Sequence, residues 1–242
     1  MAILKTLSLV STLFLAASAA PSCQKKARDV TCPEGGLLPE DSNSWLFPVG
    51  IYPISKSNPD TNYGTVYSPK ITPNDFCTIF NLYVPESAAG KTCTLEFLFP
   101  DHSQLQTSDY TFKDVNGQDT TEGHFTFTGY AFGTGANDTT TWNNQPAPGP
   151  STFILPCPFS CFFPMLRLCT RQMSLIHHYF RPPSPPATLS PGKAFVINAG
   201  DCGVQAGQGS LEVSGMLCST DTTFEYFQDS DKCPIGFYVV IS

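Results

Sequence analysis

The fold of this chain is decided by two neighbouring stretches, FCTIFNLYV at 76–84 and TCTLEFLF at 92–99. In each stretch apolar residues recur at every second position, which places their side chains on one face of an extended backbone. The residues that share that face are Phe76, Phe80, Leu82 and Val84 in the first stretch, and Cys93, Leu95, Phe97 and Phe99 in the second. This alternation, rich in aromatic residues, predicts two β-strands that each bury one face.

Six further segments show the same short alternation and are separated by turn-forming residues such as Pro, Gly and Asn. They are 110–112, 124–128, 195–198, 210–217, 222–227 and 237–241. No sustained helical period follows the first twenty residues. About eight strands without helices predict an all-β protein, an antiparallel β-sandwich of two sheets, with a barrel as the less favoured alternative.

The first twenty residues (1–20), MAILKTLSLVSTLFLAASAA, have the composition of a secretory signal peptide. Lys5 precedes an apolar run at 7–17, and the small residues at 17–19 supply a cleavage site. The run is too short to span a bilayer. We therefore expect a secreted, extracellular protein whose cysteines meet an oxidising environment.

The remaining chain is interpreted as one folded domain preceded by a short leader. Residues 21–44 lack periodicity and predict a loosely held leader or a processed pro-segment. The domain then covers 45–242, a length sufficient for a single hydrophobic core.

Composition and charge exclude several classes of partner. Charged residues make up only 14% of the chain and aromatic residues 12%, a balance typical of a folded domain. The formal net charge is −7, and loss of Lys5 with the signal peptide makes it −8. An acidic surface repels phosphate groups, so we expect neither a nucleic-acid partner nor binding to anionic membranes. The C-terminal segment at 235–242 is too short for a membrane anchor and predicts a strand.

Ten cysteines in an exported chain predict disulfides. The candidate pairs are Cys77 with Cys93 and Cys202 with Cys233, although one sequence leaves other pairings open. Closing a loop like the first one stabilises a protein by about 3 kcal/mol on chain-entropy grounds. In a tight hairpin the first pair would be far out of register. That bond therefore requires the two strands to diverge, as when the chain crosses between sheets.

The stretch from 156 to 190 differs from its surroundings, with three of the four arginines, three cysteines, two of the four histidines and no acidic residue. Its length and composition are unusual in a compact β-domain, and we interpret 156–190 as an irregular Pro- and Cys-rich insertion. Its C-x3-C-x7-C-x7-H-H spacing matches no zinc motif, so no metal site is predicted. A sharper hypothesis is a translated intron, because joining 153–155 to 191–197 restores a turn-strand pattern. Excision would, however, leave an odd number of cysteines.

Two tryptophans and one asparagine are candidates for contact with carbohydrate. Trp45 and Trp142 lie in polar, turn-rich stretches, where exposed rings would stack on sugars. The competing interpretation is that both pack in or beside the core. Asn137 opens the only Asn-x-Ser/Thr sequon of the chain, within the polar run 133–145, and predicts a glycosylated, solvent-facing loop.

No catalytic signature is present in the sequence, which has no Gly-x-Ser-x-Gly elbow, no His-Glu-x-x-His and no phosphate-binding glycine loop. Asp229 and Asp231, close to Glu225, would suit a glycosidase carboxylate pair or a calcium site. A polar turn between two strands also explains these residues and is the preferred interpretation. We therefore predict no enzymatic activity, no cofactor and no metal.

A set of short motifs gives the chain a family resemblance. They are Asn58-Pro59-Asp60, Phe80-Asn81-Leu82, GKTCTLEFLFP at 90–100, TTWN at 140–143, EYFQD at 225–229 and CPIGFY at 233–238. With these motifs the sequence from about 45 to 242, interrupted after Leu155, resembles the fungal family called the ubiquitin-three-binding protein But-two C-terminal domain. The resemblance implies a secreted or surface protein and supplies no catalytic residues. The family name reflects one member's link to a ubiquitin-like activating enzyme, which an exported protein does not normally meet, so that activity is not expected.

The leading expectation is a secreted, non-enzymatic fungal protein with a cell-wall-associated or extracellular interaction role. Its partner is unknown, with a cell-wall polysaccharide or an extracellular protein as candidates. The alternative is a carbohydrate-binding module that stacks glycans on Trp45 and Trp142. A third class, a glycoside-active enzyme using Asp229, is the least favoured.

Overall fold

The two long strands form where the alternation predicts them, as β4 (Phe76–Val84) and β5 (Thr92–Phe99). The computed structural model describes residues 30–149 and 187–242. Between β4 and β5 the chain passes from one sheet to another through a short 3-10 helix, η2 (Glu86–Ala88). The two strands therefore do not form a hairpin.

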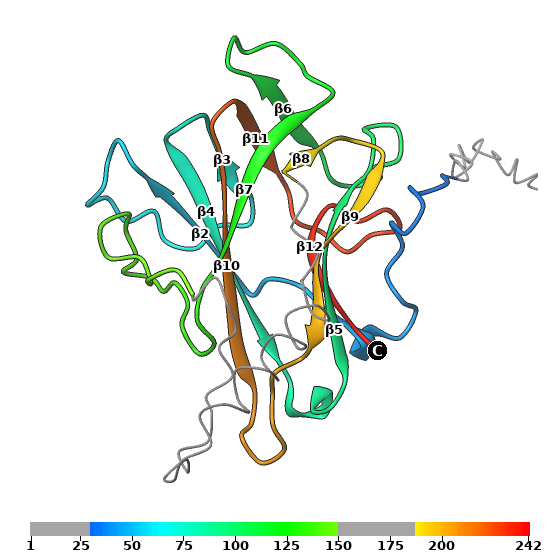
Figure 1. Cartoon of the computed structure of the whole chain (residues 1–242). Coiled ribbons are helices and arrows are strands. Elements are labelled where there is room, and N and C mark those ends of the chain that lie inside the picture. Colours follow the sequence, from blue (N-terminus) through cyan, green and yellow to red (C-terminus); the bar gives the residue numbers. More distant parts are fainter. Residues whose placement is uncertain (1–29, 150–186) are drawn as a thin grey trace, which may run out of the picture. The chain divides into compact units, whose positions relative to one another are not determined.

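The strands of the described residues pair into three antiparallel sheets (Figure 1). The first sheet has the order β1 (Trp45–Leu46), β12 (Gly236–Ile241), β5 and β9 (Lys193–Asp201). The second has the order β2 (Gly50–Ser55), β4, β10 (Leu211–Ser219), β7 (Gly123–Gly129) and β8 (Thr188–Leu189). The third has the order β3 (Lys70–Ile71), β11 (Thr222–Tyr226) and β6 (Tyr110–Asp114). A second 3-10 helix, η1 (Ser42–Ser44), precedes β1.

The prediction of an all-β, antiparallel fold is confirmed, whereas the expected number of about eight strands was too low. The described residues form twelve strands, and the additional ones are β1, β2, β3 and β8. Three of these are only two residues long and carry no alternation. β2 contains Pro53, which a strand tolerates at the sheet edge that β2 occupies, because proline donates no hydrogen bond.

Phe224 on β11 lies at the centre of the core and touches aromatic rings from all three sheets. Its ring centroid is 4.9 Å from that of Phe99 on β5, 5.3 Å from that of Phe112 on β6 and 5.7 Å from that of Phe125 on β7. Phe224 has no exposed surface. Because β11 alternates between buried and half-buried positions, both of its aromatic residues are buried.

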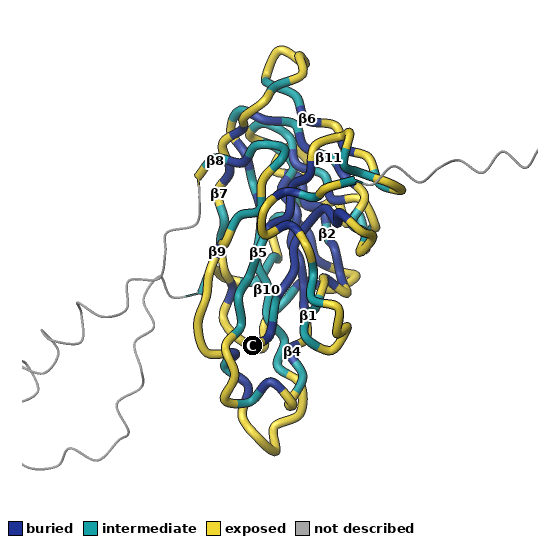
Figure 2. The backbone as a smooth tube through the Cα atoms, turned by 90° about the vertical axis from the view of Figure 1, so that its right-hand side faces the viewer, coloured by how far each residue is buried: buried dark blue, intermediate teal, exposed yellow. Residues whose placement is uncertain are grey.

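The first and second sheets also contact each other directly. The ring of Phe237 on β12 lies 4.7 Å from that of Phe80 on β4 and 5.7 Å from that of Phe127 on β7. Figure 2 shows buried residues along the middle of the strands, with exposed residues gathered in the loops at their ends. Burial of apolar surface at about 25 cal/mol per Å² makes this aromatic interior the main stabilising contribution to the fold.

Both faces of β4 are covered, although its sequence predicts one buried face. Of its nine residues only Tyr83 is exposed. The face that carries Cys77 and Ile79 is covered by the segment that follows β7, which contributes Tyr130 and, half-buried, Trp142. The polar run at 133–145 therefore folds back on the second sheet, and only part of it faces solvent.

The N-terminal segment is attached to the domain, in contrast to the loosely held leader expected at 21–44. Cys32 forms a disulfide with Cys233, just before β12. Trp45 lies edge-on against Tyr238 of β12, with ring centroids 5.9 Å apart. The described part of the leader is thus bonded to the domain, while processing of the segment 21–44 stays a prediction.

Six cysteines among the described residues form three disulfides, and both predicted pairings were wrong. The pairs are Cys32–Cys233, Cys77–Cys218 and Cys93–Cys202. Cys77 and Cys93 belong to different sheets. The partner of Cys77 lies on β10, the neighbouring strand of its own sheet, and the partner of Cys93 directly follows the neighbouring strand β9. These partners are 141 and 109 residues away in the chain, which is why the sequence did not indicate them. The remaining four cysteines lie outside the described residues.

The predicted insertion at 156–190 lies outside the described residues except at its C-terminal end. There, Thr188–Leu189 forms β8 beside β7, and the Phe125 amide donates to the Ala187 carbonyl at 2.7 Å. Leu189 is fully buried in the aromatic core. The predicted boundary at 190 was therefore wrong, because joining 155 to 191 would remove a strand and a core side chain.

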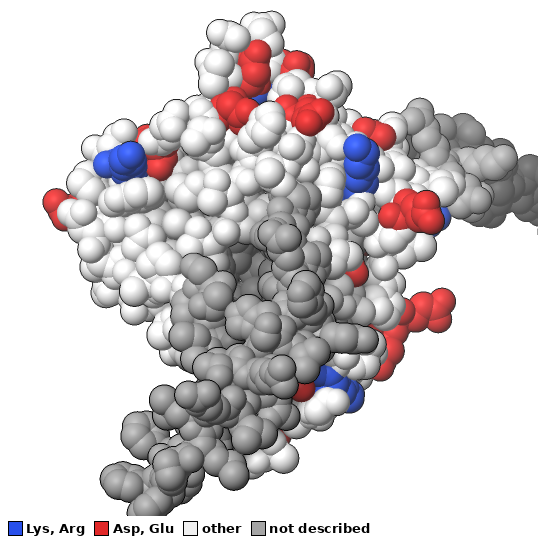
Figure 3. Space-filling view, viewed as in Figure 1, with Lys and Arg blue, Asp and Glu red and all other residues white. Residues whose placement is uncertain are grey.

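The surface drawn in Figure 3 carries scattered acidic side chains with few basic ones between them. This distribution agrees with the acidic balance of the chain, whose formal net charge is −7. In the part of the chain that the structure describes, no helix has the length and apolar character needed to cross a membrane.

The variant Phe224→Ala tests the centre of the core. It should lower the free energy of unfolding by about 3–5 kcal/mol, because it empties the position where three sheets meet. The control variant Val115→Ala changes a side chain that is 62% exposed, and its effect should stay within about 0.5 kcal/mol. Denaturant unfolding with the disulfides intact measures both, and equal losses would contradict the central role of Phe224.

Candidate functional site

A hollow of about 420 Å³ opens on the second sheet beside the loop that follows β7. We call it the Asn81 hollow. The lining residues used below include Gly50, Tyr52, Asn81, Tyr83, Asn137 and Glu212. They come from three adjacent strands, β2, β4 and β10, and from the loop itself. The site therefore combines segments that are distant in the sequence.

The strand register places Asn81 at the middle of the hollow. Asn81 on β4 lies opposite Gly50 on β2 and opposite Ser214 on β10. A Cβ atom added at Gly50 would lie 2.6 Å from the ring of Tyr52. The glycine thus lets the Tyr52 ring lie over the strand and form one wall of the hollow.

The Asn81 amide holds the loop against the sheet. Its Nδ2 donates to the Ala136 carbonyl at 2.7 Å and to Glu212 Oε1 at 3.2 Å. Its Oδ1 accepts from the Ala136 amide at 3.1 Å and from Ser214 Oγ at 2.9 Å. Asn81 is only 3% exposed, and these four contacts use its full hydrogen-bonding capacity. A Cβ atom at Gly135 would collide with the Glu212 carboxylate, so a larger residue there would displace that side chain from Asn81.

The hollow has a negative electrostatic environment. Burial raises the pKa of the Tyr52 phenol, and the charges of Asp138 and Glu212 add to that shift. The half-exposed Tyr83 donates its hydroxyl to Glu212 Oε1 at 3.4 Å. Among the described residues, the lining contains one carboxylate and no lysine or arginine. The hydroxyl of Tyr83 and the carboxylate of Glu212 offer hydrogen-bond partners that suit a neutral, hydroxyl-rich ligand.

Asn137, the predicted glycosylation site, lies at the hollow and is exposed. Its Oδ1 accepts from the Thr139 amide at 2.9 Å and from Thr139 Oγ1 at 2.7 Å, which forms an Asx turn. The surface position expected of the sequon is therefore observed, while glycosylation itself stays a prediction.

The two predicted stacking residues do not line the hollow and are both half-buried. Trp45 packs against Phe47 and Tyr238, with ring centroids 6.0 and 5.9 Å apart. Trp142 packs against the cluster that contains Ile79, on the second face of β4. These contacts match the packing interpretation. A stacking role for the tryptophans stays a prediction.

Apart from Asn137, the residues of the hollow were not expected from the sequence. One signal was present, because Asn81 is an amide within the largely apolar stretch FCTIFNLYV, and a buried amide needs hydrogen-bond partners. The partners themselves had no signal, since Ala136 and Glu212 are 55 and 131 residues away.

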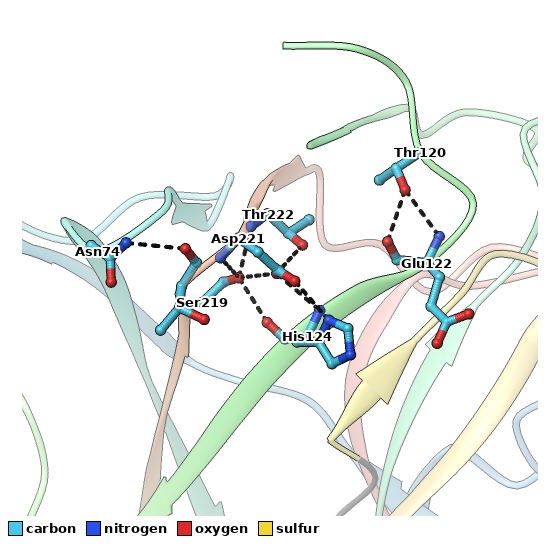
Figure 4. Close-up of polar contacts among 8 residues, drawn as sticks. Asn74, Thr120, Glu122, His124, Ser219, Asp221 and Thr222 are labelled. Atoms are coloured by element: carbon cyan, nitrogen blue, oxygen red, sulfur yellow. Dashed lines mark hydrogen bonds and ion pairs between the residues drawn. The ribbon is translucent and has the colours of Figure 1, made fainter. Parts of the chain in front are cut away.

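A second polar cluster contains the three residue types of a hydrolase triad (Figure 4). Asp221 Oδ2 lies 2.6 Å from His124 Nδ1. Ser219 Oγ, however, donates to the backbone carbonyl of His124 at 2.7 Å and does not contact the imidazole. Asp221 Oδ1 also accepts from Thr222 Oγ1 at 2.6 Å. A triad requires the serine hydroxyl at the imidazole, so this cluster instead closes the turn between β10 and β11 and ties it to β7.

Asp229 and Asp231 are brought together, since both carboxylates contact the hydroxyl of Thr107. Burial raises the pKa of Asp229, and the nearby charge of Asp231 adds to this shift. Glu225 is engaged elsewhere, 3.8 Å from Lys70. The pair lies in the irregular segment between β11 and β12, and nowhere in the described ranges do three or more metal-ligating side chains gather. This placement agrees with the polar turn preferred from the sequence.

In residues 30–149 and 187–242 these features define an all-β domain with three disulfides and a polar hollow on one sheet. Residues 46–155 match the family model described as Ubiquitin 3 binding protein But2 C-terminal domain, which confirms the resemblance drawn from the sequence. Comparison with curated proteins and with solved structures found no match. The match ends before β9, β10, β11 and β12, although these strands complete all three sheets. The folded unit therefore extends beyond the matched range.

The variant Asp221→Asn tests the turn cluster through its pH dependence. Burial alone would raise the pKa of Asp221, but hydrogen bonds from Thr222, His124 and Ser219 outweigh it, and the net pKa is lowered. Such a carboxylate stabilises the fold above its unfolded-state pKa, and this stabilisation is lost as the pH falls through the folded-state pKa. The variant should therefore be less stable at neutral pH and approach the wild type towards about pH 2.

Melting temperatures of both proteins across this pH range provide the measurement. The matched control is Glu122→Gln, because the Glu122 carboxylate makes no hydrogen bond in the described part of the chain, while its backbone is held by Thr120. The control should keep the wild-type pH profile. A constant difference between Asp221→Asn and the wild type at every pH would contradict the assignment.

Proposed function

We propose that this chain is a secreted, non-enzymatic fungal protein whose β-sandwich-type domain acts in extracellular or cell-wall-associated interactions. The observation that carries the proposal is the pairing of six cysteines in three disulfides. Disulfides of this number persist in oxidising compartments and are rare in the cytosol. The signal-peptide composition of residues 1–20 supplies the route of export.

A binding role is supported by the chemistry of the polar clusters. Ser219 donates to a backbone carbonyl, and Asp221 accepts from the residues of its own turn. The Asn81 hollow offers a single carboxylate, that of Glu212, which hydrogen-bonds to Asn81 and Tyr83. These hydrogen bonds hold backbone segments and the surface of the second sheet in fixed positions. A domain that binds a partner through its surface needs such a fixed arrangement.

Two other activities receive less support. Glycan stacking on Trp45 and Trp142 is not favoured by their contacts, because both rings pack against neighbouring apolar side chains. The matched family is described by the binding of ubiquitin 3. An exported, disulfide-linked domain does not normally meet an intracellular partner, so we do not extend that activity to this chain.

Expression of the full chain in a fungal host tests the proposal. We expect the protein in the medium or on the cell wall, without residues 1–20, and with peptides joined as Cys32–Cys233, Cys77–Cys218 and Cys93–Cys202 in non-reducing mass spectrometry. Retention inside the cell with Met1 attached and thiols reduced would overturn it.

A matched control separates export from folding. The double variant Leu13→Arg and Leu15→Arg interrupts the apolar run of the signal peptide without changing the domain. It should stay inside the cell, whereas Leu46→Ala in the domain should still be directed to the secretory pathway. Equal secretion of the wild type and the double variant would show that residues 1–20 do not direct export.

A further inference from the structure

At the Asn81 hollow, the amide nitrogen of the Asn137 side chain has no hydrogen-bond partner among the described residues. Its Oδ1 is occupied by two hydrogen bonds from Thr139, whereas its Nδ2 makes no hydrogen bond to any residue of the described ranges. Asn137 is also exposed. Nδ2 is the atom that carries an N-linked glycan, so the sequon presents its acceptor atom in an accessible position.

The backbone around Asn137 is fixed by its neighbours. The Asn137 amide donates to Thr140 Oγ1 at 2.8 Å, and the Thr140 amide donates to the Asn137 carbonyl at 2.9 Å. Asn62, before β3, donates through Nδ2 to the Asp138 carbonyl at 2.7 Å. A sugar attached at Nδ2 would therefore start from a defined position beside the hollow.

The hollow presents apolar surface next to this position. Val49 is 62% exposed and Tyr83 47% exposed, and the Tyr52 ring forms the adjacent wall. Sugar rings have apolar faces that pack on aromatic side chains, while their hydroxyl groups bond to polar neighbours such as Glu212. The volume of about 420 Å³ lies within the range of about 300–1,000 Å³ that is usual for small-molecule sites.

The negative charge at the Asn81 hollow disfavours an anionic ligand. The lining includes the carboxylate of Glu212, and the charge of Asp138 acts on Tyr52 at the hollow. No basic side chain from residues 30–149 or 187–242 lines it. An anionic ligand in the hollow would be repelled by the Glu212 carboxylate, whereas a neutral N-acetylhexosamine would not. Asn137 itself lines the hollow, so a sugar attached to its side chain would start at the hollow's edge.

We propose that Asn137 carries an N-linked glycan whose first sugars lie in the Asn81 hollow against Tyr83 and Val49. This face of the second sheet is then covered by the chain's own carbohydrate, and a protein or polysaccharide partner docks elsewhere. The proposal rests on the proposed function, because the secretory route supplies the donor. In the attachment step Nδ2 loses a proton and bonds to C1 of the first sugar, while the bond from C1 to the pyrophosphate of a lipid-linked oligosaccharide breaks.

Intact-mass measurement of secreted protein tests the attachment. Wild type and Thr139→Ser, which keeps the hydroxyl, should carry a glycan at Asn137, and Thr139→Val should carry none. A secreted, correctly disulfide-bonded wild type without a glycan would overturn this inference and leave the proposed function intact. Failure of export would overturn the proposed function and, with it, the source of the glycan.

A double-mutant cycle with the melting temperature as its readout tests whether the glycan lies in the hollow. Wild-type protein trimmed enzymatically to a single N-acetylglucosamine is compared with unglycosylated Asn137→Gln, and loss of the sugar should lower the melting temperature by about 2–4 °C. In the Val49→Ser, Tyr83→Ser background this difference should disappear. In the control Tyr67→Ser, which changes an exposed tyrosine that does not line the hollow, it should persist. Equal differences in all three backgrounds would show a glycan that projects into solvent and would overturn the docking.

Discussion

The packing of Phe224 against rings from three sheets is the interaction on which the rest of the structure depends. The ladder hydrogen bonds of the strands run within each sheet, and two disulfides join neighbouring strands of one sheet, from β4 to β10 and from β5 to the residue that follows β9. Between sheets, Thr78 on β4 hydrogen-bonds to the backbone of Lys70 on β3. The arrangement of the first sheet against the other two rests mainly on side-chain packing. Aromatic rings suit this task because each buries a large area and contacts several neighbours at once.

The covering of β4 on both faces connects this core to the candidate site. One face carries Phe80 into the aromatic interior, and the other receives the loop that follows β7. Asn81 makes the second contact specific, because its amide bonds both backbone groups of Ala136. The same contact sets Asn137 at the edge of the hollow. Fold and site thus share one strand, with apolar packing on one side and hydrogen bonding on the other.

Prediction from sequence succeeded where the signal is local. β4 and β5 match the alternating stretches residue for residue, and the other six expected segments all contain strands. It failed for β1, β3 and β8, because a two-residue strand is defined by its partner and not by its own pattern. The boundary set at 190 failed for the same reason, since Leu189 becomes a core residue only when β8 meets β7.

The sequence by itself determined the all-β class, the positions of the long strands and the sequon at Asn137, because alternation and short motifs depend on adjacent residues. Only the tertiary structure decided the disulfide pairing, the three-sheet arrangement and the Asn81 hollow. Each of these joins residues about a hundred or more positions apart, such as Cys77 with Cys218 and Asn81 with Glu212. Such contacts follow from strand order and register, which local patterns do not encode.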